Sequence, residues 1–297
     1  MPTRSYRDLG QEISFRSIKS QRPDYNPQVE ICVSVLYHRI IQPTDIVIDG
    51  GANAGLHALP IAALLGLTGH LHCFEPIPSI AAGLANNLYR AGLLSRCSIH
   101  GQALSDADAT TEFFVNEANP ALSHIRNKFI DSDSETIAVP TRKIDTVVGE
   151  EALAFVKLDL EGADFLAIRG AINTIRRSLP IIVFENSRKW AARCYGYEKE
   201  EFFGLFDELD YRIIDLHGRE LRSENWEDPD LAFEFLAASC ADPRWDELLN
   251  LIENFWASMS MHPIIGEWRD CAAAVRDPIA YLQQGGSTPG LAQSSRE

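Results

Sequence analysis

Apolar positions along the chain follow two alternating patterns. Short runs of consecutive apolar residues, rich in β-branched types, are typical of strands buried on both faces, and apolar residues three or four positions apart are typical of amphipathic helices. The runs predict strands at residues 45–49, 69–75, 97–100, 155–159, 180–185, 211–215 and 231–236. The helical spacing predicts a helix from residue 26, helices after the first two strands, and helices at residues 163–177, 199–209 and 242–257.

Strands that alternate with helices predict an α/β fold, with a mostly parallel sheet covered by helices on both faces. Residues 110–140 interrupt the alternation with two strand-like runs, and the polar segment 116–135 between them is a candidate lid. Residues 1–26 read as a loosely held arm and residues 284–297 as a disordered tail. The predicted parts are an arm and helix, a central α/β domain, and a helical extension with the tail, at residues 1–43, 44–240 and 241–297.

The charge balance excludes some classes of partner. The 27 Lys and Arg residues against 42 Asp and Glu residues give a formal charge of −15, whereas a nucleic-acid binder needs a basic surface. No apolar stretch approaches the ~20 residues of a membrane-spanning helix, and the N-terminus lacks the apolar core of a secretory signal. The 6 cysteines form no CxxC pair, which is typical of buried thiols in a reducing compartment, so we expect a cytoplasmic protein.

The first predicted strand ends in an acid and continues into a glycine-rich turn, VIDGGANAGLH. Glycine lets the backbone approach a ligand closely, and Glu75, at the end of the second strand, can accept both hydroxyls of a ribose. The spacing of Gly51 and Gly55 differs from the G-x-G-x-x-G of nicotinamide-binding enzymes, and Asp49 would repel a pyrophosphate. Asp49 suits the ammonium group of S-adenosylmethionine (SAM). The alternative is a tight turn that binds no ligand.

Five segments together resemble the FkbM family of SAM-dependent methyltransferases: IVIDGGANAGLH, CFEPIP, ALSD, FVKLDLEGADFLAIRGA and IIVFEN. The similarity extends over residues 44–238, and residues 157–164 are its most specific part. The resemblance implies a Rossmann-like class I methyltransferase domain at residues 44–240, with a seven-stranded, mostly parallel sheet and an antiparallel last strand. It also implies methyl transfer to a hydroxyl of a small molecule, typically a sugar or a natural product.

Carried over to this chain, the resemblance implies a cofactor site at the first three strand ends. The methionine portion of SAM would be held by Asp49, Gly51, Asn53 and Gly55. Glu75 would bind the ribose, and Ile77 would pack on the adenine face. The residues near the adenine edge would be Ser105 and Asp106. His57 has two open interpretations: a donor to the SAM carboxylate, or a helix residue packed under the sheet edge.

Methyl transfer to an alcohol needs an aligned acceptor and a group that takes its proton. Acids at the carboxyl ends of the fourth and fifth strands of the alternation leave two mechanisms open. In the first, Asp159 or Glu161 is the general base, although Glu161 also suits a helix N-terminus for its charge alone. In the second, a Mg²⁺ ion lowers the pKa of the acceptor. Its ligands would be Asp159, Glu185 and Asn186, a set that resembles the Mg²⁺ site of catechol O-methyltransferases.

The acceptor side is less defined by the sequence. A basic group after the fifth strand either contacts an acidic or phosphorylated acceptor or forms a solvated loop: Arg188, Lys189, Trp190 and Arg193. His217 is a further candidate base, with a turn residue as the alternative interpretation. The helix from residue 26 and the helix at residues 242–257 have three open interpretations: they close the pocket, form a homodimer face, or pack in the core. The alternative functions are N-methylation of a small amine and SAM binding without turnover.

Overall fold

A computed structural model describes residues 28–116, 123–125, 135–259 and 274–278. In this part of the chain, a seven-stranded sheet has the order β10-β11-β9-β8-β1-β2-β3. Neighbouring strands are parallel except around β11, which is antiparallel to both β9 and β10. The predicted class I fold with an antiparallel last strand is therefore confirmed. The strands are β1 (Ile46–Gly50), β2 (His70–Phe74), β3 (Cys97–His100), β8 (Leu153–Leu158), β9 (Ile181–Glu185), β10 (Tyr211–Asp215) and β11 (Glu234–Ser239).

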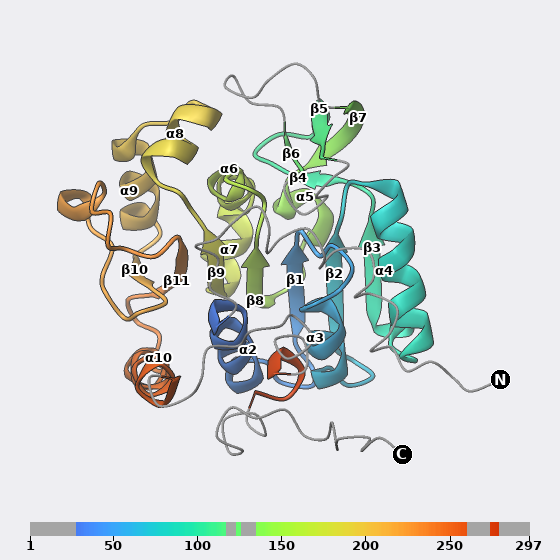
Figure 1. Cartoon of the computed structure of the whole chain (residues 1–297), viewed down its shortest axis with the longest axis horizontal. Helices are drawn as coiled ribbons and strands as arrows, with labels where there is room; N and C mark the ends of the chain where they lie inside the picture. Colours follow the sequence, from blue (N-terminus) through green and yellow to red (C-terminus); the bar gives the residue numbers. More distant parts are fainter. Residues whose placement is uncertain (1–27, 117–122, 126–134, 260–273, 279–297) are drawn as a thin grey trace, which may run out of the picture.

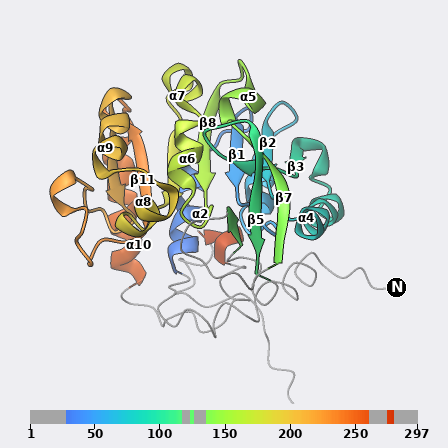
Figure 2. The ribbon, with the colours of Figure 1, turned by 90° about the horizontal axis from the view of Figure 1, so that it is seen from above.

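Helices cover both faces of this sheet (Figures 1 and 2). One apolar core lies between the sheet and four helices: α2 (Gln28–Ile40), α3 (Ala58–Leu64), α4 (Pro78–Arg90) and α10 (Trp245–Met259). A second core lies on the opposite face, under α5 (Ile144–Val148), α6 (Asp164–Arg169), α7 (Ile172–Ser178), α8 (Lys189–Tyr195) and α9 (Lys199–Glu208). Burial of the continuous apolar strands on both sides explains why they show no alternation with polar residues.

A second, four-stranded sheet lies beyond the carboxyl ends of β1 and β2 (Figure 1). Its order is β4-β7-β5-β6, with bounds β4 (Ala103–Leu104), β5 (Ala109–Val115), β6 (His124–Ile125) and β7 (Glu135–Arg142). Strands β5 and β7 correspond to the two runs that interrupt the predicted alternation. Most of the candidate lid between them lies outside the described residues, as do the N-terminal arm and the C-terminal tail.

Two predicted elements differ from the structure. The single helix predicted at residues 163–177 is divided into α6 and α7, because the chain bends at Gly170, where a Cβ atom would lie 2.1 Å from the Ser105 carbonyl oxygen. The strand predicted at residues 231–236 begins and ends three residues later in the structure, as β11 (Glu234–Ser239). The carbonyl oxygens of Leu231 and Ala232 accept hydrogen bonds from the Arg188 guanidinium, so these residues do not extend the sheet.

The C-terminal extension packs onto the domain core. Trp245 and Phe255 of α10 are buried in the same apolar cluster as the side chains of α2, in agreement with the core-packing interpretation of this helix. Among the described residues, we find no helix with the length and apolar character needed to cross a membrane.

Candidate active site

The tip of β1 carries the glycine-rich turn. Gly51 has a φ of +75°, and a Cβ atom there would lie 2.0 Å from the carbonyl oxygen of Asp159. The N–H groups of Gly51 and Ala52 both donate to the Phe74 carbonyl, at 3.0 Å each. Only glycine therefore fits at position 51, and the turn is packed against the ends of both β8 and β2.

Asp49 is a buried carboxylate without a hydrogen bond. Its relative exposure is 1%, and neither of its oxygens has a hydrogen-bond partner in the described part of the chain. The nearest cation is Lys157, the register partner of Asp49 on β8, with Nζ 3.8 Å from Oδ1. Burial raises the pKa of Asp49, and the nearby Lys157 and His57 lower it in part. Unsatisfied buried polar atoms are rare in folded proteins, so Asp49 has the character of a ligand-binding group.

Glu75 lies at the end of β2 and is fixed by the backbone around it. Its Oε2 accepts a hydrogen bond from the N–H of Asn53 at 3.1 Å, and its Oε1 accepts one from the N–H of Ile77 at 2.9 Å. Burial raises the pKa of Glu75 to about 7, although both hydrogen bonds lower it. Each carboxylate oxygen can accept a second hydrogen bond, so Glu75 can still bind ligand hydroxyls.

Gly55 and His57 lie between the turn and α3. Gly55 has a φ of +98°, and a Cβ atom there would contact the side chains of Leu84 and Leu59, so the glycine allows α3 to pack on α4. His57 is 4% exposed, and its Nε2 lies 2.8 Å from Oε2 of Glu30 on α2. Its Nδ1 is buried without a hydrogen-bond partner among the described residues. His57 is thus packed against α2 and also has one buried nitrogen without a hydrogen-bond partner in the described part of the chain.

The residues predicted near the adenine lie around β4. Ile77 is buried in a small apolar cluster with Ala103 and Phe113. Ser105 Oγ donates to Asp106 Oδ1 at 3.3 Å, and Asp106 forms an ion pair with Arg169 of α6. The structure therefore places these residues beyond the ends of β2 and β3, on the Glu75 side of the turn.

Three carboxylates converge at the ends of β8 and β9. Asp159, Glu161 and Glu185 each place one oxygen within 4.8 Å of the other two, an arrangement that could hold a metal ion. Burial and the charges of Glu161 and Asp159 raise the pKa of Glu185 well above its ordinary value. The side chain of Asp159 is 43% exposed, and its Oδ2 lies 3.5 Å from Lys157 Nζ. Lys157 therefore lies between Asp49, which precedes the glycine-rich turn, and Asp159, the predicted general base.

The side chain of Asn186, which follows β9, is held by two neighbours. Its Oδ1 accepts a hydrogen bond from the N–H of Arg188 at 2.6 Å, and its Nδ2 donates to the hydroxyl of Tyr197 at 3.0 Å. The structure brings Glu161 together with Asp159 and Glu185.

Two further charged residues of the site carried no predicted role. Lys157 is 4% exposed within an otherwise apolar strand, and this single charge in a buried run was the available signal. Asp164 is fully buried and accepts hydrogen bonds from the N–H groups of Leu160 and Glu185, both at 3.3 Å. Burial raises the pKa of Asp164 to about 8. Asp164 fixes the loop after β8 against the end of β9.

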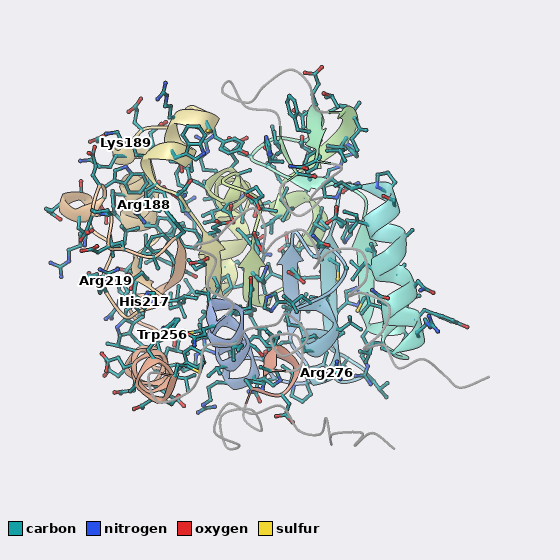
Figure 3. All side chains as sticks on the ribbon, in the orientation of Figure 1. Arg188, Lys189, His217, Arg219, Trp256 and Arg276 are labelled. Carbon is teal, nitrogen blue, oxygen red and sulfur yellow. The ribbon has the colours of Figure 1, made fainter. Side chains whose placement is uncertain are left out.

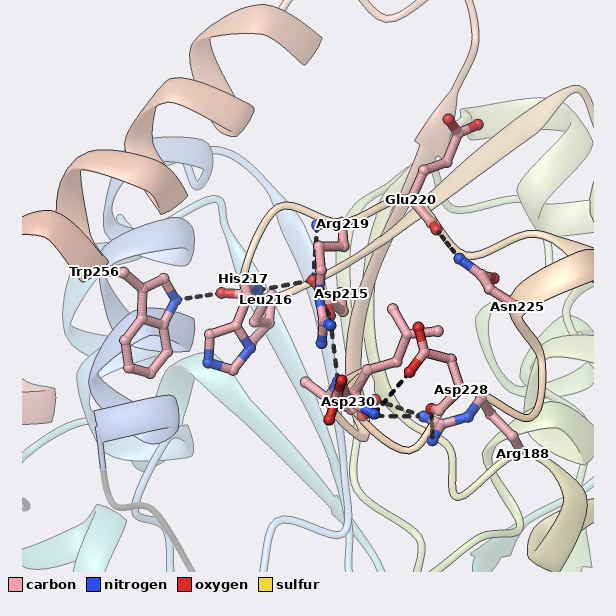
Figure 4. A network of polar contacts seen from close by, with 12 residues as sticks. Arg188, Asp215, Leu216, His217, Arg219, Glu220, Asn225, Asp228, Asp230 and Trp256 are labelled. Atoms are coloured by element: carbon pink, nitrogen blue, oxygen red, sulfur yellow. Dashed lines mark hydrogen bonds and ion pairs between the residues drawn. The ribbon is translucent and has the colours of Figure 1, made fainter.

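Arg188 does not belong to a solvated basic patch. It is 6% exposed, and its guanidinium donates to the carbonyl oxygens of Trp226, Asp228 and Ala232 at 3.0, 3.1 and 2.7 Å (Figure 4). The neighbouring Lys189 forms a 3.1 Å ion pair with Glu227 on the surface, and both residues lie at the β10 end of the sheet (Figure 3). Arg188 therefore holds the β10–β11 loop and is not available to an acceptor.

His217 follows β10 and has the position of a turn residue. Its ring stacks on Trp256 of α10 with centroids 4.5 Å apart (Figure 4). The stacking and the hydrogen bond from Trp256 Nε1 to the Leu216 carbonyl connect this loop to α10, so the structure offers a packing role for His217.

Comparison with known proteins agrees with this arrangement. The sequence profile of the methyltransferase FkbM domain matches residues 49–213, more than half of the chain. No curated protein matches. Among solved structures, the chain is similar to methyltransferase FkbM from Methylobacillus flagellatus KT, with 17% identity, a TM-score of 0.42, and coverage of 78% of this chain and 57% of that one.

A second similar structure is the O-methyltransferase TomG from Streptomyces achromogenes, involved in tomaymycin synthesis and in complex with SAM. It has 14% identity and a TM-score of 0.38, over 72% of this chain and 78% of that one. The chain belongs to the FkbM methyltransferase domain family.

Proposed function

We propose that the protein is a SAM-dependent O-methyltransferase that acts on a hydroxyl of a small molecule. The observation that carries the proposal is Asp49, a carboxylate that is 1% exposed and has no hydrogen bond from the described residues, at the ligand-binding edge of the sheet. An ammonium group would satisfy both its charge and its lone pairs. The cationic amino-acid portion of SAM has that group, whereas the pyrophosphate of a nicotinamide cofactor would be repelled.

The residues around the turn fit SAM. Asp49 would bind the ammonium group, and Glu75 would accept the ribose hydroxyls with the lone pairs that its backbone hydrogen bonds leave. The backbone of Gly51 and Asn53 would line the methionine portion, and Ile77 would contact the adenine. When bound, SAM supplies a methyl group on a positively charged sulfur, so the protein's own task is to orient the acceptor and remove its proton.

Asp159 is the residue that we propose as the general base. Its side chain is 43% exposed and lies beside Lys157, which holds one carboxylate oxygen at 3.5 Å and leaves the other for an acceptor hydroxyl. Glu161 is the second candidate, because one of its oxygens lies within 4.8 Å of Asp159 and Glu185. Removal of the hydroxyl proton by either carboxylate turns a poor nucleophile into a good one.

A Mg²⁺ ion is the alternative means of activation. Asp159, Glu161 and Glu185 would be its carboxylate ligands, an all-oxygen set of the kind that Mg²⁺ prefers. When bound, the ion would lower the pKa of the acceptor hydroxyl. A chelator distinguishes the two mechanisms: full turnover after treatment with EDTA favours the general base, and a loss that added Mg²⁺ restores favours the ion.

The proposal is tested with the full chain in two steps. Calorimetry should detect binding of SAM and of its demethylated product S-adenosylhomocysteine (SAH) but not of NADH; NADH binding without SAH binding would reject the proposal. SAM is then incubated with panels of sugars, phenols and amines, and methylated products are identified by mass spectrometry. Methylation confined to amines would replace O-methylation by N-methylation, and SAM binding without any product would favour a binding protein.

A further inference from the structure

Helix α2 lies outside the segment matched by the family profile, yet it contacts the cofactor turn. Glu30, in the first turn of α2, has Oε2 2.8 Å from Nε2 of His57, the residue before α3. The two side chains are only 17% and 5% exposed. A buried polar link between elements that are 27 residues apart in the chain holds the imidazole in one orientation.

The opposite nitrogen of the same ring is unsatisfied. Nδ1 of His57 and both carboxylate oxygens of Asp49 are buried atoms without hydrogen-bond partners in the described residues. The two side chains are close enough for His57 to lower the pKa of Asp49. A carboxylate and an imidazole nitrogen, both buried without hydrogen-bond partners in the described residues, suit a ligand with groups of both signs, because buried polar atoms are normally paired.

We propose that Glu30 is a positioning residue for the amino-acid portion of SAM, a role that rests on the proposed function. Glu30 accepts the Nε2 proton of His57 and fixes the orientation of the ring, so that a proton on Nδ1 is donated to the ligand carboxylate. Asp49 accepts from the ligand ammonium. Helix α2 thereby contributes to cofactor selectivity, although the match to the family begins only at residue 49.

The charged and titratable groups around His57 come from three elements. Glu30 and Tyr37 face it from α2, with the Tyr37 ring edge-on at a centroid distance of 5.7 Å. Asp49 lies on β1, and Lys157 on β8 pairs with Asp49 from the other side. Glu30 is the acid that contacts the ring directly, so a substitution of Glu30 tests this contact.

The test compares three ligands that differ in the amino-acid portion. SAH carries the ammonium and the carboxylate, decarboxylated SAM keeps the ammonium alone, and 5′-methylthioadenosine lacks the whole portion. Kd values are measured by calorimetry for the wild type and for Glu30→Gln, which keeps the size and an acceptor oxygen but loses the charge. Glu247→Gln is the matched control, because Glu247 of α10 also pairs with α2, through Arg39 on its exposed side.

We expect Glu30→Gln to weaken SAH binding roughly tenfold, the scale of one charge-assisted hydrogen bond. Binding of decarboxylated SAM and of 5′-methylthioadenosine should stay within about twofold, and Glu247→Gln should bind all three ligands normally. His57→Asn, a second variant, should show the same selective loss.

Equal weakening of all three ligands would mean that Glu30 only supports the fold, and would overturn the inference. Unchanged SAH binding in both Glu30→Gln and His57→Asn would overturn it as well. If the wild type binds none of the three ligands, the proposed function fails and the inference fails with it. If the wild type binds them and the variants show no selectivity, the inference alone fails.

Discussion

Asp49 and Asp215 occupy similar places in the fold and have opposite surroundings. Each lies at the carboxyl end of a strand of the same sheet, and each is buried, with relative exposures of 1% and 0%. Four N–H groups donate to Asp215: the backbone N–H groups of His217, Arg219 and Ala232, and Nε of Arg219 (Figure 4). Asp49 has no hydrogen bond from the described residues.

The contrast shows what separates a structural carboxylate from a ligand-binding one. Burial and location at a strand end are common to both residues, so neither feature identifies a site. The hydrogen bonds differ: Asp215 is satisfied by the loop that it organises, whereas the lone pairs of Asp49, which have no partner among the described residues, are the ones that we propose for a ligand. Substitutions at the two positions should therefore affect different properties.

The largest effect is expected for Asp215→Ala. The change leaves buried N–H groups unsatisfied and removes the ion pair with Arg219, so the free energy of unfolding should fall by about 4 kcal/mol. Urea denaturation followed by fluorescence measures the loss. SAH affinity of the folded fraction should not change, and a weakened affinity would show that the β10–β11 loop also serves the cofactor.

The next effect concerns pH and Glu75, whose pKa in the folded chain is raised from 4.5 to about 7 by burial. Between these two pH values, the folded state keeps a proton on Glu75 that the unfolded state releases. The stability that this proton binding provides is present below about pH 4.5 and is lost as the pH rises through 7. In Glu75→Gln, the side chain at position 75 does not titrate, so this loss does not occur. Between pH 4.5 and 8, the ligand-free wild type should lose about 3 kcal/mol more stability than the variant. Parallel stability curves for the two proteins would contradict the prediction.

A smaller effect, on binding and not on folding, is expected for Asp49→Asn. Loss of the charge that meets the ligand ammonium should weaken SAH binding about 100-fold, which equals about 2.7 kcal/mol. The free energy of unfolding should fall by only about 1 kcal/mol, because Asp49 has no hydrogen bond from the described residues and Lys157, which loses it as a partner, keeps the ion pair with Asp159. A large loss of stability at normal affinity would place Asp49 with Asp215 among the structural acids.

The fold and the cofactor side were predictable because their signals are local. Apolar runs mark the strands, and parallel strands bring their carboxyl ends to one edge. Asp49 and Glu75 follow from this rule, as does the convergence of Asp159 with Glu185.

The remaining features depend on contacts between distant segments. Arg188 reads as a surface charge until the loop at residues 226–232 supplies carbonyl groups to its guanidinium. Likewise, Glu30 is one acid among many on an amphipathic helix, and only the packing of α2 beside α3 brings it to His57. Neither partner can be inferred from spacing, because chain separation does not determine which loops meet.

The contact between Gly51 and Asp159 also bears on how this protein can be redesigned. Any side chain at position 51 would collide with the main chain of Asp159, whose N–H also donates to the Gly50 carbonyl at 3.1 Å. The tips of β1 and β8 thus hold each other in place, so a mutation that changes the backbone at one tip would also displace the other. Libraries aimed at new acceptors should therefore leave both tips intact and randomise exposed positions instead, such as Lys189 and Trp190 of α8.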